Sequence, residues 1–411
     1  MDSMIWPSGC LPIPWNCWSG TGFTNILIPA GITEPAMEPK ISPGRRRWHW
    51  IFCRPLPHKR WPPSSFTDMK ALLTLLRERM KIKITLLLLP ATLFLLWGSC
   101  KKSGMALETQ NHLSVVEVLQ TSRRVLWIGA HPDDETSSAG LLARAADIAD
   151  SLFLISVTRG ENSDRLWNGL RRGSEIGAAR AMLFAQSGRV LHAQIVETGP
   201  FVNGPRTLRE LDEEPSGAPF QPWPPETTPE QVAAKWERDW SGGDPVNYFV
   251  NVLRRWRPDV VISMDGYCGV SGHPEHLAVA RLLLRAIPLA ANPTVNPTTG
   301  SPWKVKYVIF TAHVIPELIA CGYCKCQDAP PHEKVEKVPA LDSSAVHGMS
   351  YFRVGCLVAK HYQNIMEERG WSEAQIQSLC RQAEQAAREA YHQGNDAYPI
   401  TEPYRVQAVN R

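Results

Sequence analysis

The sequence predicts an α/β protein with a mainly parallel β-sheet, helices on both of its faces and a single catalytic domain. From Arg123 onward, short apolar runs alternate with segments of helical periodicity. Two of these runs end in polar residues that are followed by a helix. The chain has 411 residues, 44% of them hydrophobic and 20% charged, so it can bury a sizeable core.

The expected elements follow one another as strand, helix and strand. Buried strands are expected where apolar and β-branched residues run together, and helices where apolar residues recur every third or fourth position. The strands are expected at residues 125–129, 151–158, 190–196, 260–263 and 304–311. The helices are expected at residues 136–148, 172–184, 245–256, 274–287 and 372–393.

Three further segments complete the predicted organisation of the main domain, which spans residues 123–393. A stretch rich in Pro and Gly at residues 199–228 is expected to be a functional surface loop. Ser372 and Gln375 form a capping-box pair at the start of the last helix. Residues 394–411 are expected to be a C-terminal tail.

Residues 1–79 have a different composition, dense in Pro, Trp, Gly and Arg and without helical or strand period. They are either a disordered extension or translated sequence upstream of the real start. Met80 opens a segment typical of a secretory signal, residues 80–99. Its apolar part, residues 84–97, is shorter than the roughly 20 residues of a membrane span.

Gly98 and Ser99 precede Cys100, and this pattern resembles the bacterial lipoprotein signal, in which Cys100 would be the lipidated first residue of the mature chain. Trp97 departs from that pattern, where a smaller aliphatic residue is usual. An uncleaved anchor helix and an artefact of the assigned start remain open. Residues 100–122 are then a tether. The expected location is outside the cytoplasm, on the membrane, as a periplasmic or cell-surface lipoprotein.

Polar residues stand at the carboxyl ends of two predicted strands. His131, Asp133 and Asp134 follow the strand at residues 125–129, and His276 follows the strand at residues 260–263 after a short loop. Because the carboxyl ends of parallel strands meet at one edge of a sheet, we expect these side chains to lie together. Either motif alone is also typical of a turn or a helix start.

Together the two motifs indicate a metal site. Two imidazoles and one carboxylate, from His131, His276 and Asp134, are the ligand set of a catalytic zinc with an open position. Asp133 is then a free carboxylate that can act as general base on water. His273, in the second motif, can stabilise an oxyanion or protonate a leaving amine.

Four motifs resemble those of the LmbE-like (PIG-L type) zinc-dependent N-acetylglucosaminyl deacetylase family. AHPDDE at residues 130–135 and GHPEH at residues 272–276 are the most specific. TRGE at residues 158–161 and the pair Arg172 and Glu175 match further family segments. The resemblance extends over residues 123–287. It implies a Rossmann-like fold, one zinc ion per active site, and hydrolysis of an N-acetyl amide on an amino sugar.

The resemblance also implies roles for individual residues. His131, Asp134 and His276 would be the zinc ligands, Asp133 the general base and His273 the partner of the oxyanion or leaving group. Arg172 would bind substrate hydroxyls, although it could equally be a solvated helix residue paired with Glu175. Ser271 stands where some members have Tyr, and His361-Tyr362-Gln363 is shorter than the family's His-x-Ser-Gln. Glu135 is either a partner of a ligand histidine or a carboxylate at a helix start.

Other functions remain open at this point. A zinc amidase acting on a different amide, such as a conjugate or a cell-wall fragment, would use the same residues. A non-catalytic sugar- or metal-binding lipoprotein would have no need of Asp133. A dinucleotide-binding enzyme is disfavoured because no G-x-G-x-x-G follows the first strand. The net charge of +4 does not argue for nucleic acid, so the expected partners are an N-acetylated sugar or glycan and the membrane.

Six cysteines lie in the main domain, and three of them, Cys321, Cys324 and Cys326, are close together. In an oxidising compartment these cysteines favour a loop that is cross-linked by disulfides. A structural metal knuckle with His332 and plain thiols are the alternatives.

Overall fold

The computed structural model describes residues 113–296, 298–312, 326, 334–393 and 401–409. The predictions for residues 1–79, for the signal at residues 80–99 and for lipidation of Cys100 lie outside the described residues. Cys321, Cys324 and His332 lie outside them as well.

A seven-stranded sheet forms the centre of the described part, with strand order β3–β2–β1–β4–β5–β9–β6. Its strands are β1 (Arg124–Gly129), β2 (Ser151–Ser156), β3 (Ile195–Thr198), β4 (Val260–Met264), β5 (Tyr307–Thr311), β6 (Glu336–Pro339) and β9 (Thr401–Ala408). The strands from β3 to β5 pair in parallel, whereas β9 is antiparallel to both of its neighbours. The predicted mainly parallel sheet is confirmed. A separate small sheet joins β7 (Ser343–Ser344) and β8 (Met349–Ser350).

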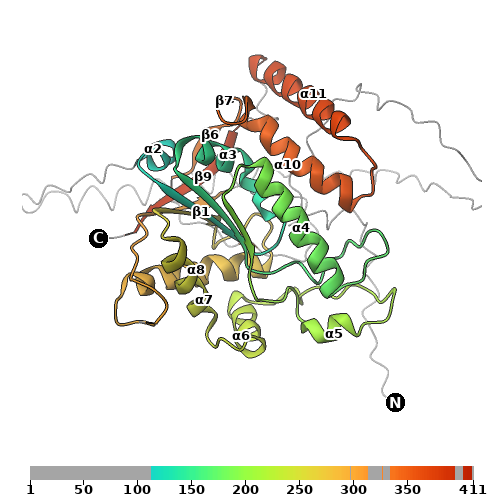
Figure 1. Ribbon diagram of the computed structural model, residues 1–411, viewed down its shortest axis with the longest axis vertical. Helices are drawn as coiled ribbons and strands as arrows, with labels where there is room; N and C mark the ends of the chain where they lie inside the picture. The colour runs from blue at the N-terminus through green and yellow to red at the C-terminus, as the bar shows by residue number, and fades with distance from the viewer. Residues whose placement is uncertain (1–112, 297, 313–325, 327–333, 394–400, 410–411) are drawn as a thin grey trace, which may run out of the picture. The chain divides into compact units, whose positions relative to one another are not determined.

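Helices cover both faces of the sheet, as predicted (Figure 1). The first face carries α2 (Val115–Gln120), α3 (Ala139–Ile148), α4 (Ser174–Val190) and α10 (Tyr351–Met366), with α11 (Glu373–His392) packed on α10. The second face carries α6 (Pro229–Asp239), α7 (Pro245–Trp256) and α8 (Pro274–Ala291). Two short helices, η2 (Asp134–Ser138) and α5 (Leu208–Asp212), lie in connecting segments. Strand β1 alternates between the two cores, with Trp127 in the first and Ile128 in the second.

The third strand begins later than predicted, at Ile195 instead of residue 190. Helix α4 continues past the predicted end at residue 184 and stops only at Val190, because Ser187 and Gly188 are still on its buried face. The chain then turns at His192, whose φ is +56°. Helices α6 and α10 were not predicted, whereas the capping box of Ser372 and Gln375 at α11 is confirmed.

Two segments assigned to the tether and the tail belong to the folded domain. Helix α2 lies within residues 100–122, and its Val118 and Leu119 are fully buried. Strand β9 lies within residues 394–411 and inserts between β5 and β6, where Tyr404 is fully buried. The predicted boundaries at residues 123 and 393 are therefore too narrow. The contacts that hold both segments come from strands far away in the sequence, so local periodicity does not reveal them.

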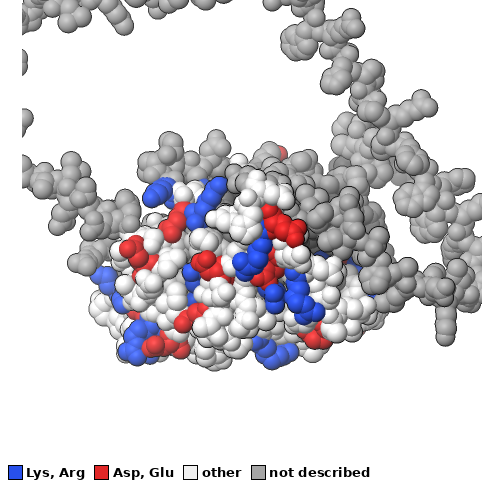
Figure 2. All heavy atoms as spheres, turned by 90° about the horizontal axis from the view of Figure 1, so that it is seen from above, with Lys and Arg blue, Asp and Glu red and all other residues white. Residues whose placement is uncertain are grey.

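The surface of the described part carries charges of both signs. On the face in Figure 2, basic and acidic side chains are interspersed and no extended patch of one sign appears among the described residues. None of the described helices is both long enough and apolar enough to cross a membrane.

A disulfide between Cys356 and Cys380 joins α10 to α11, and both residues are fully buried. We expect the double variant Cys356→Ser/Cys380→Ser to lose about 2–4 kcal/mol of unfolding free energy, because the disulfide restricts the unfolded chain. Urea unfolding followed by circular dichroism measures this loss. Untreated wild type serves as the reference, because a reductant would also break the second disulfide, Cys268–Cys326. A variant as stable as oxidised wild type would contradict a stabilising disulfide here.

Candidate metal centre

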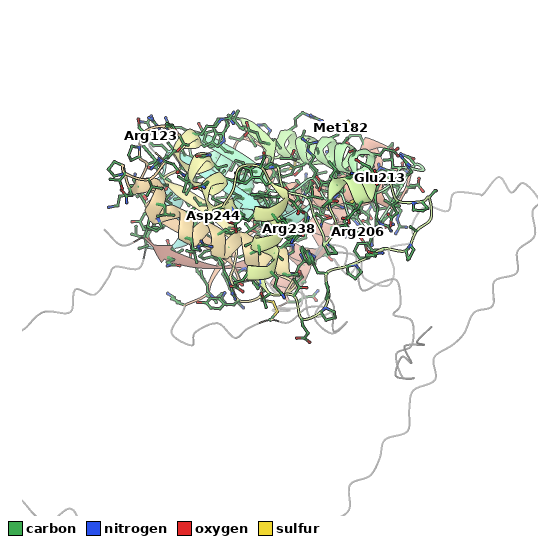
Figure 3. All side chains as sticks on the ribbon, turned by 90° about the horizontal axis from the view of Figure 1, so that it is seen from below. Arg123, Met182, Arg206, Glu213, Arg238 and Asp244 are labelled. Carbon is green, nitrogen blue, oxygen red and sulfur yellow. A yellow bond between two sulfur atoms is a disulfide. The ribbon has the colours of Figure 1, made fainter. Side chains whose placement is uncertain are left out.

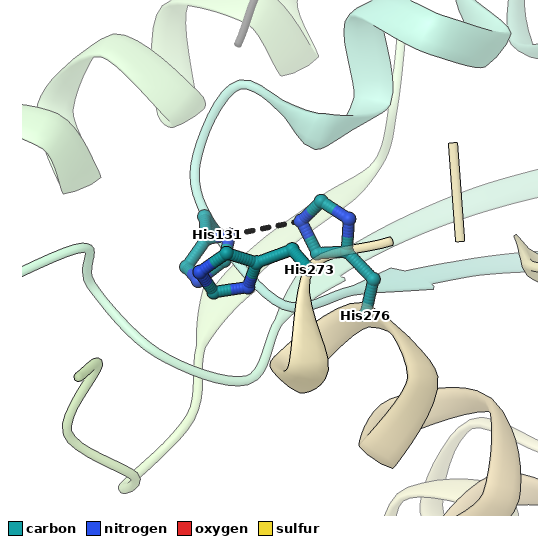
Figure 4. Close-up of side chains that lie close together, drawn as sticks. All are labelled: His131, His273 and His276. Carbon is teal, nitrogen blue, oxygen red and sulfur yellow. Dashed lines mark hydrogen bonds between the residues drawn. The ribbon is translucent and has the colours of Figure 1, made fainter. Parts of the chain in front are cut away.

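The two polar motifs meet at the carboxyl edge of the sheet, as predicted. Strands β1 and β4 are parallel neighbours, with Ile128 beside Ser263, and the chain order changes direction between them. The rings of His131 and His276 lie 5.2 Å apart, and the ring of His273 lies 5.0 Å from each (Figure 4). Each of the three imidazoles offers one ring nitrogen, and these three nitrogens lie within 4.8 Å of one another.

Hydrogen bonds on the outer side of two rings decide which nitrogens face the site. The Nδ1 of His276 lies 2.7 Å from the carbonyl oxygen of Gly269, and the Nε2 of His131 lies 2.5 Å from the Oε2 of Glu275. Because both partners are acceptors, these two nitrogens carry the hydrogen. When both rings are neutral, as metal binding requires, the lone pairs are on His131 Nδ1 and His276 Nε2, which face each other at 3.2 Å.

Asp134 completes a set of three donors around the same point. Its Oδ1 lies 3.2 Å from His276 Nε2, and its Oδ2 lies 3.5 Å from His131 Nδ1. The backbone N–H groups of Ala130 and His131 donate to Oδ2 at 2.9 and 2.8 Å and hold the carboxylate in place. Bonds of about 2.0–2.1 Å in a tetrahedral zinc site place ligand atoms about 3.3 Å apart. The three residues therefore fit a cation of that size.

The charges of the pocket also favour a cation. Burial by itself lowers the pKa of His131, but Asp134 and Glu275 outweigh it and raise that pKa to about 10. Burial by itself raises the pKa of Asp134, yet His276 and His131 hold it well below its usual range. The two facing ring nitrogens, next to two carboxylates, therefore favour a positive charge between them, which is either a proton on His131 or a metal cation in its place.

His273 stands beside these donors as a neutral imidazole. Burial, together with neighbouring His131 and His276, lowers the pKa of His273 to about 3. Its Nδ1 accepts from the backbone N–H of Glu275 at 3.4 Å, so His273 is the N-cap of α8. The remaining ring nitrogen is then an N–H donor. In the other tautomer it would be a third imidazole ligand, an alternative to Asp134.

Asp133 has a strained backbone and a paired carboxylate. Its φ is +113°, which is unfavourable for a residue with a Cβ. Its Oδ2 lies 2.9 Å from Arg180 Nη2, which also donates to the carbonyl of Pro132 at 2.6 Å. Burial raises the pKa of Asp133, and Arg180 opposes that rise. Sequence reasoning missed Arg180, although its spacing from Ile176 and Leu183 places it on the buried face of α4.

Glu275 was also missed, and it joins the metal centre to the segment after β3. The N–H groups of Gly204 and of the Trp223 indole donate to its Oε1 at 2.6 and 2.7 Å. The Nδ2 of Asn203 donates to Oε2 at 3.3 Å, next to His131. The sequence signal that could have revealed this role is the position of the Glu275 carboxylate next to the predicted ligand His276.

We expect Glu275→Gln to weaken metal binding about 10–100-fold, since a neutral amide orients and polarises His131 less well. Competition with a chelator of known affinity measures this change. Glu213→Gln, at an exposed residue paired with Arg209, is the matched control and should bind metal as wild type does. Equal metal affinity of the two variants would contradict the role of Glu275.

Arg172 is buried and binds several loop segments together. Its Nε donates to the carbonyl of Ser163 at 3.0 Å, and its Nη1 donates to the carbonyl of Ala218 at 2.9 Å. Glu214 lies between Arg172 and Arg206, at 3.3 and 2.7 Å. In Figure 3, Arg206 and Glu213 lie on the other side of the described part from Arg123, which precedes β1. The role of Arg172 in binding substrate hydroxyls stays a prediction.

The alternative interpretation of Arg172, as a solvated residue paired with Glu175, is wrong. Glu175 pairs with Arg171, at 3.2 Å, and that pair is exposed. The reason is that α4 begins at Ser174, after Gly173 with a φ of +95°, and not at residue 172. Arg172 therefore precedes the helix and points into the loops.

The loop before His273 is held by residues distant in the sequence. Cys326 forms a disulfide with Cys268, so the metal knuckle with Cys326 is wrong and the disulfide prediction is confirmed for this residue. Asp265 accepts from the N–H groups of Cys268 and Gly269 at 2.7 and 2.9 Å, and Arg405 of β9 pairs with it. This arrangement presents the Gly269 carbonyl to His276.

Gly269 is required at its position for two reasons. Its φ is +54°, and a Cβ there would lie 2.6 Å from the Cβ of His276. Any larger residue would displace the imidazole or the loop.

Comparison with known proteins finds similarity in the central part of the chain. The profile of the family described as PIG-L, GlcNAc-PI de-N-acetylase, matches residues 126–287. A 1D-myo-inositol 2-acetamido-2-deoxy-α-D-glucopyranoside deacetylase of Geodermatophilus obscurus is 31% identical over 198 residues, which are 46% of this chain and 60% of the relative. The corresponding Streptomyces avermitilis deacetylase is 29% identical over 54% of this chain and 71% of its own length.

The chain thus spans 60% of the length of the Geodermatophilus relative. Among solved structures, the N,N'-diacetylchitobiose deacetylase from Pyrococcus horikoshii matches 72% of this chain and 88% of its own, with a TM-score of 0.43 and 13% identity. A deacetylase of teicoplanin biosynthesis matches 70% of this chain and 99% of its own, with a TM-score of 0.41 and 14% identity.

Proposed function

We propose, from the match of residues 126–287 to the profile of the PIG-L (LmbE-like) family, that the protein is a zinc-dependent hydrolase that removes the N-acetyl group from an amino sugar of the N-acetylglucosamine type. The observation that carries the proposal is the meeting of two ring lone pairs and a carboxylate, with a second carboxylate on the adjacent residue. The names of the relatives, which describe deacetylation of a 2-acetamido sugar linked to inositol, support this substrate class.

His131, Asp134 and His276 would hold the metal, and the spacing of their donor atoms supports zinc. A zinc ion in such a site supplies Lewis-acid polarisation of the amide carbonyl. The depth of the pocket strengthens every charge interaction within it, because all three residues are at most 9% exposed.

The protein's own residues would handle the protons. Asp133 accepts a proton from the attacking water at a carboxylate oxygen, while Arg180 holds the other end of that carboxylate. The neutral His273 donates a hydrogen bond from its free N–H toward the charge that develops on the amide oxygen, or toward the departing nitrogen, which takes up the proton that Asp133 removed from water. Acetate and the free amino sugar are the products.

Acetate release tests this proposal. The substrates are free N-acetylglucosamine, an N-acetylglucosaminyl-inositol, N,N'-diacetylchitobiose and a peptide-type amide without sugar. We expect acetate from at least one acetylated sugar, and none from it after metal removal or in Asp133→Ala. Cleavage of the peptide-type amide alone would favour the amidase. Bound metal without any cleavage would favour a binding protein.

We also propose that the protein is exported and anchored to the membrane through Cys100. The signal-like pattern at residues 80–99 and two disulfides among the described residues support an oxidising location. Cys100→Ser should shift the mature protein from the membrane to the soluble fraction, and mass analysis of the mature N-terminus should find a lipidated Cys100. An unmodified chain beginning at Met1 would contradict this proposal.

A further inference from the structure

The strained backbone of Asp133 is held by a carboxylate two residues further on. The N–H of Asp133 donates to Glu135 Oε2 at 3.0 Å, and the hydroxyl of Thr136 donates to the Asp133 carbonyl at 2.6 Å. Glu135 is fully buried. A positive φ at a non-glycine residue persists only where its surroundings hold it, so Glu135 helps to determine where the Asp133 carboxylate points.

Glu135 is itself held by a residue 227 positions away. The hydroxyl of Tyr362 donates to Glu135 Oε1 at 2.8 Å. Tyr362 is 1% exposed and lies on α10, which packs against α3, α4 and η2 (Figure 1). This helix lies beyond residues 126–287, the part that matches the family profile.

We propose that Tyr362 is a positioning residue for Asp133. Its hydroxyl fixes the Glu135 carboxylate, which binds the Asp133 amide and so keeps the Asp133 carboxylate opposite Arg180. Without that hydroxyl, the buried Glu135 carboxylate loses one of its donors and is held less firmly. The catalytic consequence rests on the proposed function, whereas the effect on the Asp133 backbone does not.

A second buried tyrosine offers a matched control. The hydroxyl of Tyr404 donates to Glu402, whose carboxylate accepts from the N–H groups of Gly140 and Leu141 at 3.0 and 2.9 Å. This pair has the same chemistry and a fully buried tyrosine, but it binds the start of α3 instead of Asp133. Tyr404→Phe therefore reports what the loss of a buried Tyr–Glu hydrogen bond does to stability alone.

The experiment compares Tyr362→Phe with Tyr404→Phe in the metal-loaded protein. Hydrogen–deuterium exchange of the peptide that contains Asp133 should quicken about three- to tenfold in Tyr362→Phe only. The value of kcat should fall by a similar factor, with KM and metal content unchanged. Glu135→Gln should lower kcat too, and adding Tyr362→Phe to it should cost little more, because the two act as one unit.

The possible outcomes separate the two proposals. If wild type deacetylates and Tyr362→Phe alters neither exchange nor kcat beyond the change in Tyr404→Phe, the positioning role is overturned. A loss of kcat that follows loss of metal overturns it as well. If wild type is inactive on every substrate, the proposed function fails, while the exchange comparison still decides whether Tyr362 holds Asp133.

Discussion

Asp133→Asn should lower kcat for N-acetyl hydrolysis about 10²–10⁴-fold. The side chain keeps its shape, but its amide oxygen cannot take up the proton of the attacking water. Because Asp133 points toward Arg180 and is separate from the donor set of His131, Asp134 and His276, the metal content should stay near that of wild type. Acetate release under saturating substrate measures kcat, and plasma mass spectrometry measures the metal.

Asp150→Asn is the control for this experiment. Asp150 is an exposed residue paired with Arg123, away from the carboxyl edge of the sheet, and its variant should retain full activity. A variant Asp133→Asn that keeps wild-type kcat would refute the general-base role. Loss of metal in Asp133→Asn would mean that the carboxylate holds the metal and not the water.

His276→Ala should lower metal affinity more than about a hundredfold and abolish activity, since a lost ligand affects binding more than a lost partner of a ligand does. The Nε2 of His276 lies 3.2 Å from both His131 Nδ1 and Asp134 Oδ1, so its loss removes one of the three donors. Equilibrium dialysis against Zn²⁺ measures the affinity. His392→Ala, at the exposed end of α11, should bind zinc as wild type does.

The same measurement distinguishes the two possible ligand sets. If Asp134 is the third ligand, Asp134→Asn loses zinc while His273→Ala keeps zinc and loses rate. If His273 is the third ligand, His273→Ala loses zinc, while Asp134→Asn keeps zinc and loses rate. Zinc bound at one ion per chain in His276→Ala would contradict both sets.

Local sequence patterns were sufficient to predict the types of the central secondary-structure elements and to find the two candidate metal-binding motifs. Apolar runs and helical spacing depend on neighbours within a few residues, so the types and order of the central strands and helices were predicted, although the end of α4 and the start of β3 were displaced. The prediction that His131 and His276 meet followed from a general property of parallel sheets, and the 5.2 Å between their rings confirms it.

Only the tertiary structure decided which polar residues support these ligands. Each supporting residue contacts a partner that is distant in the sequence. Arg180 pairs with Asp133, 47 positions away, and Glu275 bonds His131, 144 positions away. Tyr362 bonds Glu135, 227 positions away. A buried charge or hydroxyl carries no periodic signal, because its partner can come from any element that packs beside it. For the same reason the sequence did not show that β9 inserts beside β5 or that Cys268 pairs with Cys326. The sequence by itself determined the class of fold and the chemistry of two motifs, and long-range packing decided how that chemistry is held.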